Sequence, residues 1–287
     1  VKLFLDNSER IELNARDNDG RTAFMEACRY GRKDVVQLLL DNSKIIDFNA
    51  RPNYGSTAFI AACWNGDKDV VKLLLDHSNR IELNARNNDG WTAFMAACWN
   101  GHKDVVKLLV DHSDGIELNA RRIDGLTAFM VACRFGHKDV VKLLLDDNSE
   151  IIDLNARQNN GWTAFMLACR NGHKDVVKLL LDRSERIELN AKNNNGLTAL
   201  MFACKYGQKD VVQFFLDHSY IIELNAKSNN GNTAFMLACR YGCKDVVKLL
   251  LEHFERIELN TRNNLGLTAF MLTCRYGHKD VVKLLLE

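Results

Sequence analysis

The sequence has almost no net charge and lacks the motifs of the common enzyme classes. Its 38 Lys and Arg residues against 37 Asp and Glu residues leave a formal net charge of +1, so no overall field steers nucleic acid or acidic lipid toward the protein. No apolar run approaches the ~18 residues of a membrane-spanning helix, and no basic segment leads into an apolar stretch as in a signal peptide. The patterns Gly-x-x-x-x-Gly-Lys, His-Glu-x-x-His and Gly-x-Ser-x-Gly are all missing. Nothing indicates an enzyme or a small-molecule substrate, and we expect no cofactor.

The sequence does contain one segment of twenty-odd residues that is repeated along the chain. The stretch "GWTAFMLACRNGHKDVVKLLLD" at 161–182 is nearly repeated at 90–111 as "GWTAFMAACWNGHKDVVKLLVD". Self-similarity at a fixed period is the signature of repeat architectures. The glycine before the "TA" of each copy recurs at a spacing of 35 residues, with one step of 36, at Gly20, Gly55, Gly90, Gly125, Gly161, Gly196, Gly231 and Gly266.

One copy predicts two short helices separated by a tight turn. In the copy at 84–113, Thr92 is placed to cap a first helix in which Phe94, Ala97 and Cys98 form one apolar stripe. Gly101 ends this helix, because glycine enters the left-handed conformation without a Cβ penalty. A second helix follows, with Val105, Val106, Leu108 and Leu109 expected inward and Lys103, Asp104 and Lys107 toward water.

Each helix is about ten residues long, whereas an isolated helix needs ~12–15 residues to overcome nucleation. Neighbouring copies must therefore stabilise one another. Between the helices of successive copies, "IELNAR" at 81–86 alternates apolar and polar residues, which predicts an extended strand. With the "NNDG" turn that follows, this strand is expected to form a hairpin-like finger.

The order of helix, tight turn, helix and finger resembles the ankyrin repeat. The family phrase is Asp-x-x-Gly-x-Thr-Pro-Leu-His-x-Ala-Ala-x-x-Gly-His, followed by a Val-Val-x-Leu-Leu-Leu helix and by Val-Asn-Ala. This chain has "DNDGRTAFMEACRYGRKDVVQLLLD" from Asp17 and "NDGWTAFMAACWNGHKDVVKLLVD" from Asn88. The resemblance implies an all-α repeat solenoid of stacked helix-turn-helix units with hairpin-like fingers, curved around a concave groove. It covers 1–287 as a single domain, in which 1–16 is the second helix and finger of a partial repeat and eight repeats follow.

Two departures from the family phrase affect the expected details. "TPLH" has become "TAFM" in the first copy, so the proline that favours a helix start is gone, and so is the histidine near the turn. The linker after the second helix is longer than the family's, which makes the period 35 residues rather than 33.

The positions that differ between copies are the candidate binding residues, since identical positions are those that stacking demands. They lie just before the threonine and at the end of the first helix, and all four tryptophans fall there. In the ankyrin family these positions line the groove where partners bind. Trp and Arg are enriched at interface hot spots. We therefore predict an aromatic half and a later basic, tyrosine-rich half of a partner-binding surface, with the candidates Trp64, Trp91, Trp99, Arg134, Phe135, Trp162, Arg170, Tyr206 and Tyr241.

Cysteine, histidine and arginine also recur once per copy. Equivalent cysteines in stacked repeats are expected roughly 8–10 Å apart, too far for disulfides, which indicates free thiols and a reducing compartment, cytoplasmic or nuclear. Histidines spaced once per repeat do not favour a metal site. A basic column along the fingers could track phosphates, but pairing with the acidic residues of the same segments is the better interpretation. The column comprises Arg16, Arg51, Arg86, Arg121, Arg157, Lys192, Lys227 and Arg262.

The function expected from these patterns is non-catalytic binding of a protein or peptide segment in the groove. A structural alternative is a spacer that joins end to end with other arrays, because apolar residues such as Met271, Leu272 and Leu285 near the end of the chain are interior choices. Nucleic-acid binding through the basic column ranks last, and no membrane association is expected.

Overall fold

The computed structural model describes residues 12–42, 45–146, 150–218 and 220–287. The chain forms two compact units, which we call unit 1 (1–132 with 142–153) and unit 2 (133–141 with 154–287). The predicted second helix of a partial repeat at the start of the chain lies largely within 1–11, outside the described residues. Sixteen α-helices of the described segments follow one another in pairs, each pair occupying one copy of the repeated phrase.

Each pair consists of a first helix and a second helix. In unit 1 the pairs are α2 (Ala23–Arg29) with α3 (Lys33–Asn42), α4 (Ala58–Asn65) with α5 (Lys68–Asp76), and α6 (Ala93–Asn100) with α7 (Lys103–Asp111), followed by the short 3-10 helix η1 (Ser113–Gly115). Helices α8 (Ala128–Phe135) and α9 (Lys138–Asp146) form the fourth pair, and residues of both belong partly to each unit. In unit 2 the pairs are α10 (Ala164–Arg170) with α11 (Lys174–Leu181), α12 (Ala199–Lys205) with α13 (Lys209–Asp217), α14 (Ala234–Arg240) with α15 (Lys244–Leu251), and α16 (Ala269–Tyr276) with α17 (Lys279–Leu286); η2 (Phe254–Arg256) follows α15.

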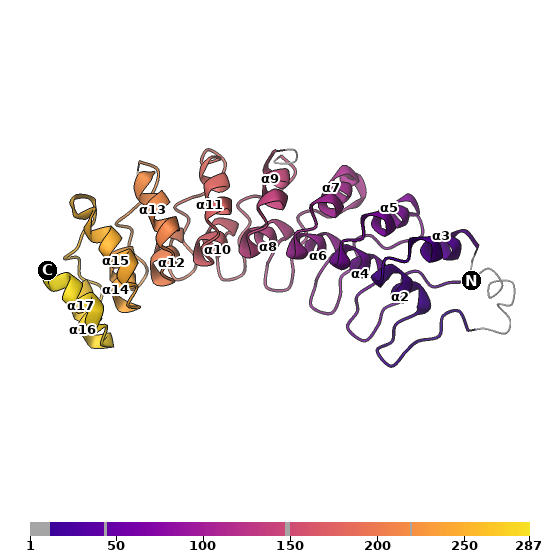
Figure 1. Cartoon of the computed structure of the whole chain (residues 1–287), viewed down its shortest axis with the longest axis horizontal. Coiled ribbons are helices and arrows are strands. Elements are labelled where there is room, and N and C mark those ends of the chain that lie inside the picture. Colours follow the sequence, from indigo (N-terminus) through magenta and orange to yellow (C-terminus); the bar gives the residue numbers. More distant parts are fainter. Residues whose placement is uncertain (1–11, 43–44, 147–149, 219) are drawn as a thin grey trace. The chain divides into compact units, whose positions relative to one another are not determined.

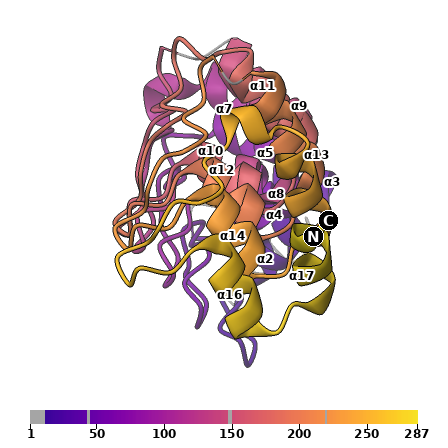
Figure 2. The same ribbon diagram turned by 90° about the vertical axis from the view of Figure 1, so that its left-hand side faces the viewer.

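Within each unit the helices stack in two layers. First helices pack on first helices, α2 on α4 on α6 and α10 on α12 on α14 on α16, and second helices pack on second helices in the same order (Figure 1). Figure 2 shows the fingers of successive repeats projecting to one side of these layers. The helices of these rows are therefore each covered by a counterpart one repeat away, which stabilises helices of seven to ten residues.

The same position in two successive repeats shows how much of the core comes from the next repeat. The Phe235 side chain is 3% exposed, whereas Phe270, its equivalent in α16, is 42% exposed because no repeat of this chain packs over it. The intervening core is built mainly from Phe, Val, Leu and the small Ala-Cys pair of each first helix.

The local signals in the sequence act as predicted. The Thr92 hydroxyl accepts a hydrogen bond from Met95 N at 3.2 Å, and Gly101 ends α6 with φ of 71°. In α7 Val105, Val106 and Leu109 are buried, but Leu108 is only half-buried and Val110 takes the inward position beside Leu109.

The predicted strand before each finger is wrong. The described residues contain no β-strand, and Ala85 N donates to Glu82 O at 3.3 Å, so "IELNAR" begins with a turn. Its alternation has another cause: Ile81 and Ala85 are buried while Glu82 is exposed. The Glu82 N–H is satisfied by the side chain of Asn49 in the preceding repeat, at 2.8 Å, instead of by a neighbouring strand. The hairpin-like fingertip is confirmed, because Asn87 N donates to Trp91 O across it at 3.0 Å.

Candidate interaction surface

The candidate residues of each repeat project from one edge, because caps and turns hold both ends of the first helix. Threonine fixes the start of the helix, and a left-handed glycine directly after the variable pair fixes its end. The residue before the threonine closes the fingertip and lies beside that pair. We call this edge, formed by the fingertips and the ends of the first helices, the inner edge of a unit.

In unit 1 three of the predicted tryptophans form one cluster, which we call the Trp cluster: Trp64, Trp91 and Trp99. The Trp64 ring stacks on Trp99 with centroids 6.0 Å apart, and Trp91 meets both rings edge-on, at 6.2 Å from Trp64 and 4.9 Å from Trp99. The three residues are not equally accessible. Trp64 is 42% exposed and Trp99 is half-buried, whereas Trp91 is only 7% exposed and has Arg122 Cζ 5.3 Å from its ring centroid. Trp91 is therefore the buried member of the cluster, and Trp64 is its most exposed one.

A pocket of about 300 Å³ lies beside Trp64 in unit 1. Polar residues also line it: Arg21 Nε donates to the Tyr54 hydroxyl at 2.8 Å, and this contact raises the pKa of the Arg21 guanidinium. Glu26 lies between two arginines, with its buried Oε1 3.7 Å from Arg21 Nε and 3.9 Å from Arg29 Nη1 and with no hydrogen-bond partner. The pocket thus combines an apolar wall with charged groups, an arrangement typical of binding sites. Arg21 and Tyr54 were not among the residues predicted from the sequence.

In unit 2 the predicted residues form a row of aromatic rings and cations instead of a cluster of indoles. Trp162 packs on Phe202 with ring centroids 3.9 Å apart and is half-buried. Arg170 Cζ lies 5.4 Å from the Trp162 ring and 4.9 Å from that of Tyr206, in the next repeat. The structure therefore brings Trp162, Arg170 and Tyr206 together, and Tyr241 joins them through Lys205, whose Nζ is 5.3 Å from the Tyr206 ring and 5.0 Å from the Tyr241 ring.

Arg134 and Phe135 occupy the same edge at the end of α8. Both are half-buried, with Arg134 Cζ 5.6 Å from the Phe135 ring. The Phe135 ring also lies 6.4 Å from the ring of His137. The Arg134 carbonyl accepts a hydrogen bond from the His173 ring at 2.8 Å, which ties this helix end to the next repeat.

The basic column along the fingers is an inter-repeat connection, as the pairing interpretation predicts. Arg86 Nη2 lies 3.2 Å from Glu117 Oε2 of the next repeat, and its Nη1 donates to Arg121 O at 2.6 Å. Arg51 and Arg157 make the same two kinds of contact one repeat onward. Three of the column's cations are thus already paired with carboxylates, so the column offers little to a phosphate backbone.

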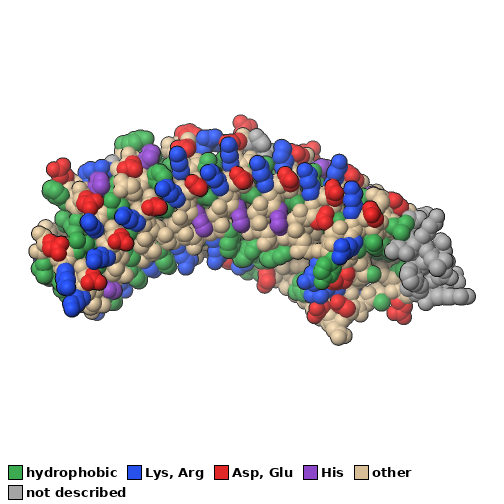
Figure 3. Space-filling view, viewed as in Figure 1, with side chains coloured by type: hydrophobic (Ala, Val, Ile, Leu, Met, Phe, Trp, Pro, Cys, Tyr) green, Lys and Arg blue, Asp and Glu red, His purple; other side chains and the backbone are tan. Residues whose placement is uncertain are grey.

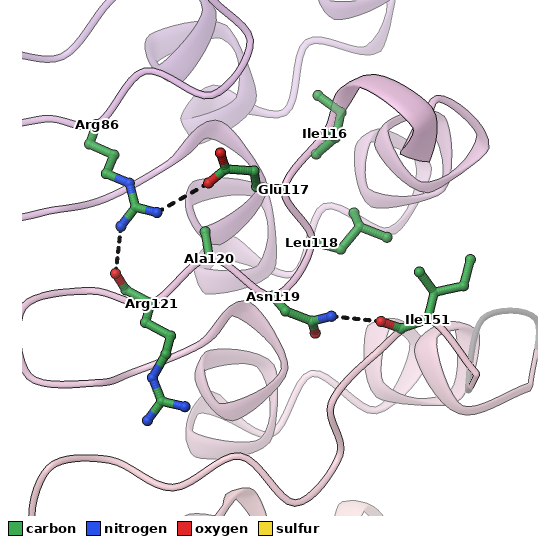
Figure 4. A pocket seen from close by; sticks show the side chains of 8 residues that line it. All are labelled: Arg86, Ile116, Glu117, Leu118, Asn119, Ala120, Arg121 and Ile151. Atoms are coloured by element: carbon green, nitrogen blue, oxygen red, sulfur yellow. Dashed lines mark hydrogen bonds and ion pairs between the residues drawn. The ribbon is translucent and has the colours of Figure 1, made fainter.

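A depression of about 570 Å³ lies over this column in unit 1 and is lined by 116–121 with Arg86 and Ile151 (Figure 4). The polar groups drawn there are engaged: Arg86 binds Glu117 and the Arg121 carbonyl, and Asn119 Nδ2 donates to Ile151 O at 2.6 Å. This depression is larger than the pocket beside Trp64, but it is not the better candidate binding site. A ligand that bound there would have to break the contacts between repeats.

The asparagine that precedes each finger connects the repeats in a way that the sequence interpretation missed. Asn84 Nδ2 donates to Gly115 O at 2.9 Å, and Glu117 N donates to Asn84 Oδ1 at 2.9 Å, so one side chain grips the backbone of the next repeat twice. The available signal was its presence in every copy. The same pair of hydrogen bonds is made by Asn14, Asn49, Asn119, Asn155, Asn190 and Asn225.

Among the described residues, the histidines named here bond to backbone carbonyls of the preceding repeat, and most of the cysteines are buried in the core. The rings of His102 and His278 bond to the carbonyls of Trp64 and Arg240 in the preceding repeat, at 2.9 and 2.8 Å. No cysteine of the described segments forms a disulfide, and all but Cys243 and Cys274 are buried. Burial raises the pKa of the Cys239 thiol to about 12. No group of three or more potential metal ligands occurs within the described ranges.

Among the described residues, no helix has the length and apolarity needed to cross a membrane. No curated protein matches the chain significantly. A family model described as ankyrin repeats in three copies matches the chain in overlapping segments, at 1–52, 43–122, 79–158, 115–193, 148–228 and 183–263. A model of the single ankyrin repeat matches 265–287. With tandem helix pairs stacked in two layers and matches along nearly its whole length, the chain belongs to the ankyrin repeat family.

Proposed function

We propose that this protein is a non-catalytic interaction module that binds a protein or peptide segment along its inner edge. Ankyrin repeats are generally protein-interaction modules. The observation that carries the proposal is the Trp cluster, where an exposed indole is held by two others beside a pocket of about 300 Å³. Rigid aromatic anchors of this kind lose little conformational entropy on binding and dominate many interfaces.

The positions of the Trp cluster support the proposal independently of its geometry. Stacking alone would place the same residue at these positions in every copy, yet the first-helix end carries Trp-Asn at 64–65 and 99–100 and Arg-Tyr at 240–241. Such differences on an otherwise uniform scaffold indicate that the residues of the inner edge are set by the binding of a partner and not by stacking.

The test begins with peptides selected from a displayed random library by binding to the full chain. Affinity is then measured by fluorescence anisotropy for the unaltered chain and for Trp64→Ala. Losing a central anchor costs ~2 kcal/mol or more, so the dissociation constant should rise about 30-fold. Trp64→Phe, which keeps an aromatic ring, should retain most of the affinity.

Tyr220→Ala is the matched control, because this side chain is also an exposed aromatic, 81% exposed, but lies in the linker after α13. Far-UV circular dichroism verifies that each variant is folded. An affinity unchanged by Trp64→Ala, or lowered equally by Tyr220→Ala, rules out the Trp cluster as the anchor.

The end of unit 2 favours self-association as a second function. A cavity of about 470 Å³ there is lined mostly by apolar residues of α16, α17, α14, the end of α15 and the segment 259–260. Phe270, Met271 and Leu286 are exposed around it, on the surface where a further repeat would stack. If this face joins arrays end to end, light scattering should show a mass that rises with concentration and that Leu286→Asp keeps at the monomer value. A constant monomeric mass excludes the joining.

A further inference from the structure

The inner edge of unit 2 carries an alternating row of cations and tyrosines, which we call the cation–tyrosine ladder: Arg170, Tyr206, Lys205, Tyr241, Arg240 and Tyr276. Each cation reaches the ring of its own repeat or finger and that of the next repeat. For Arg240 Cζ the distances are 5.6 Å to Tyr241 and 5.1 Å to Tyr276. Such contacts lie within the range of cation–π attraction. The rings thus hold the cations in place without neutralising their charge.

The stretches of sequence that carry this ladder contain no acidic residue. From the finger through the first helix to the start of the second helix, 157–174, 192–209, 227–244 and 262–279 contain neither Asp nor Glu. Each corresponding stretch of the first four copies contains at least one, for example Glu26, Asp67 and Asp89. Arg170, Lys205 and Arg240 have no carboxylate partner in the part of the chain that the structure describes.

Several other cations of the same unit are paired with carboxylates. Over the second helices, side chains of both signs lie next to one another (Figure 3), as with Lys138 Nζ 3.7 Å from Asp175 and Lys174 Nζ 3.9 Å from Asp210. On the fingers Arg157 binds Glu188 at 2.6 Å. At the ladder, by contrast, Arg170, Lys205 and Arg240 have no such partner among the described residues, and Tyr206 and Tyr241 remain exposed beside them.

We propose that the cation–tyrosine ladder of unit 2 binds an extended acidic polypeptide segment with a carboxylate at about every third residue. Arg170 Cζ and Lys205 Nζ lie 4.9 and 5.3 Å from the same ring, so neighbouring cations are separated by about 10 Å or less, the spacing of packed helices. An extended chain advances ~3.3 Å per residue, so three residues match one step of the ladder. This inference rests on the proposed function, since it takes the inner edge to be the binding surface.

A polypeptide fits these observations better than single-stranded nucleic acid. Sequence-tolerant binding of nucleic acid relies on aromatic faces on which bases stack. Here Tyr206 and Tyr241 each have two cations at their rings, which compete with bases for those faces. Carboxylates need only the outward N–H groups of the cations.

The test uses two fluorescent twelve-residue peptides of equal composition, one with Glu at every third position and one with the same glutamates consecutive. With the full chain, the spaced peptide should bind about 10-fold more tightly, and its affinity should fall as salt is raised. A triple variant, Arg170→Gln with Lys205→Gln and Arg240→Gln, should weaken it on the order of 30-fold, since it removes three favourable charge contacts.

Two matched variants separate charge at the ladder from general effects. Arg170→Lys with Lys205→Arg and Arg240→Lys keeps the charges and should keep the binding. Lys178→Gln removes one exposed cation from α11, away from the inner edge, and should change affinity less than 2-fold, as expected for a distant screened charge.

Equal affinity of the two peptides, or an unchanged affinity of the triple variant, overturns the inference. Tighter, ladder-dependent binding of an oligothymidine probe also overturns it, in favour of nucleic acid. The peptides selected for the Trp cluster distinguish this failure from failure of the proposed function. If their binding still depends on Trp64, only the ladder assignment is wrong.

Discussion

The asparagine connections between repeats lead to a prediction that the chain can test against itself. Asn84→Ala removes both hydrogen bonds that this side chain makes to the following repeat, with Gly115 O and Glu117 N, each 2.9 Å long. Asn260 occupies the same position in the last copy, where no repeat of this chain follows, and the described residues show no such bonds for it. Asn260→Ala therefore removes the same atoms without removing the connection.

The expected cost of Asn84→Ala follows from the two bonds. A hydrogen bond contributes ~0.5–1.5 kcal/mol net. Both partners here belong to exposed residues, Gly115 and Glu117, where water replaces a lost partner at modest cost. We therefore expect the free energy of unfolding to fall by about 1.5 kcal/mol for Asn84→Ala and by under ~0.5 kcal/mol for Asn260→Ala, the usual scale of a surface substitution.

Denaturant titration followed by far-UV circular dichroism measures the difference. The data are best fitted with nearest-neighbour coupling between repeats, because stability in such arrays is approximately a sum of repeat and interface terms. Asn84→Ala should also broaden the transition, since it weakens the coupling between the third and fourth fingers. Equal losses in the two variants would refute the idea that these side chains join the repeats.

Two further predictions concern groups at the contacts between repeats. Burial raises the pKa of Cys239 to about 12, while an unfolded thiol ionises near pH ~8.5. The unfolded state therefore releases this proton first, and from about pH 9 up to the folded pKa the thiol should lower the free energy of unfolding by up to ~1.4 kcal/mol per pH unit. In Cys239→Ala, the free energies of unfolding from denaturant titrations at pH ~9 and ~10 should differ less than in the unaltered chain. An unaltered dependence of the free energy of unfolding on pH contradicts this prediction. Gly242→Ala should cost about 1–2 kcal/mol more than Gly277→Ala: both glycines are left-handed, with φ of 67° and 73°, but an added Cβ meets His278 Nδ1 at 2.5 Å only at Gly242. Equal losses in thermal or denaturant unfolding would show that only backbone strain matters.

Local chemistry made the helices of this fold predictable from one sequence. The threonine cap, the glycine stop and the apolar stripe act within a few residues of each other, so Thr92 and Gly101 could be assigned without knowing what surrounds them. The segment 81–86 was wrongly predicted as a strand because alternation of apolar and polar residues shows only that one side of a segment is buried. It does not show which groups the backbone N–H and C=O bond to. Ile81 and Ala85 face the core, but the backbone hydrogen bonds go to turns and to an asparagine one repeat away.

The candidate site was only partly predictable for the same reason. Comparing the copies identified which positions vary, and it selected Trp64, Trp91 and Trp99 together. Their different roles depend on which neighbour covers each ring: Trp91 is enclosed by the other two indoles and Arg122, while Trp64 stays open. Arg21 and Tyr54 enter the site through a contact between residues from successive fingers, which no pattern within one copy reveals.

The sequence by itself determined the period, the helix boundaries and membership of a stacked array, because these depend on propensities and caps that act over a few residues. Only the tertiary structure decided which side chains of one repeat meet those of the next. These contacts join residues 31 to 40 positions apart. Their geometry follows from how neighbouring repeats pack, and it decides which indole stays exposed and which cations of the described residues have no carboxylate partner.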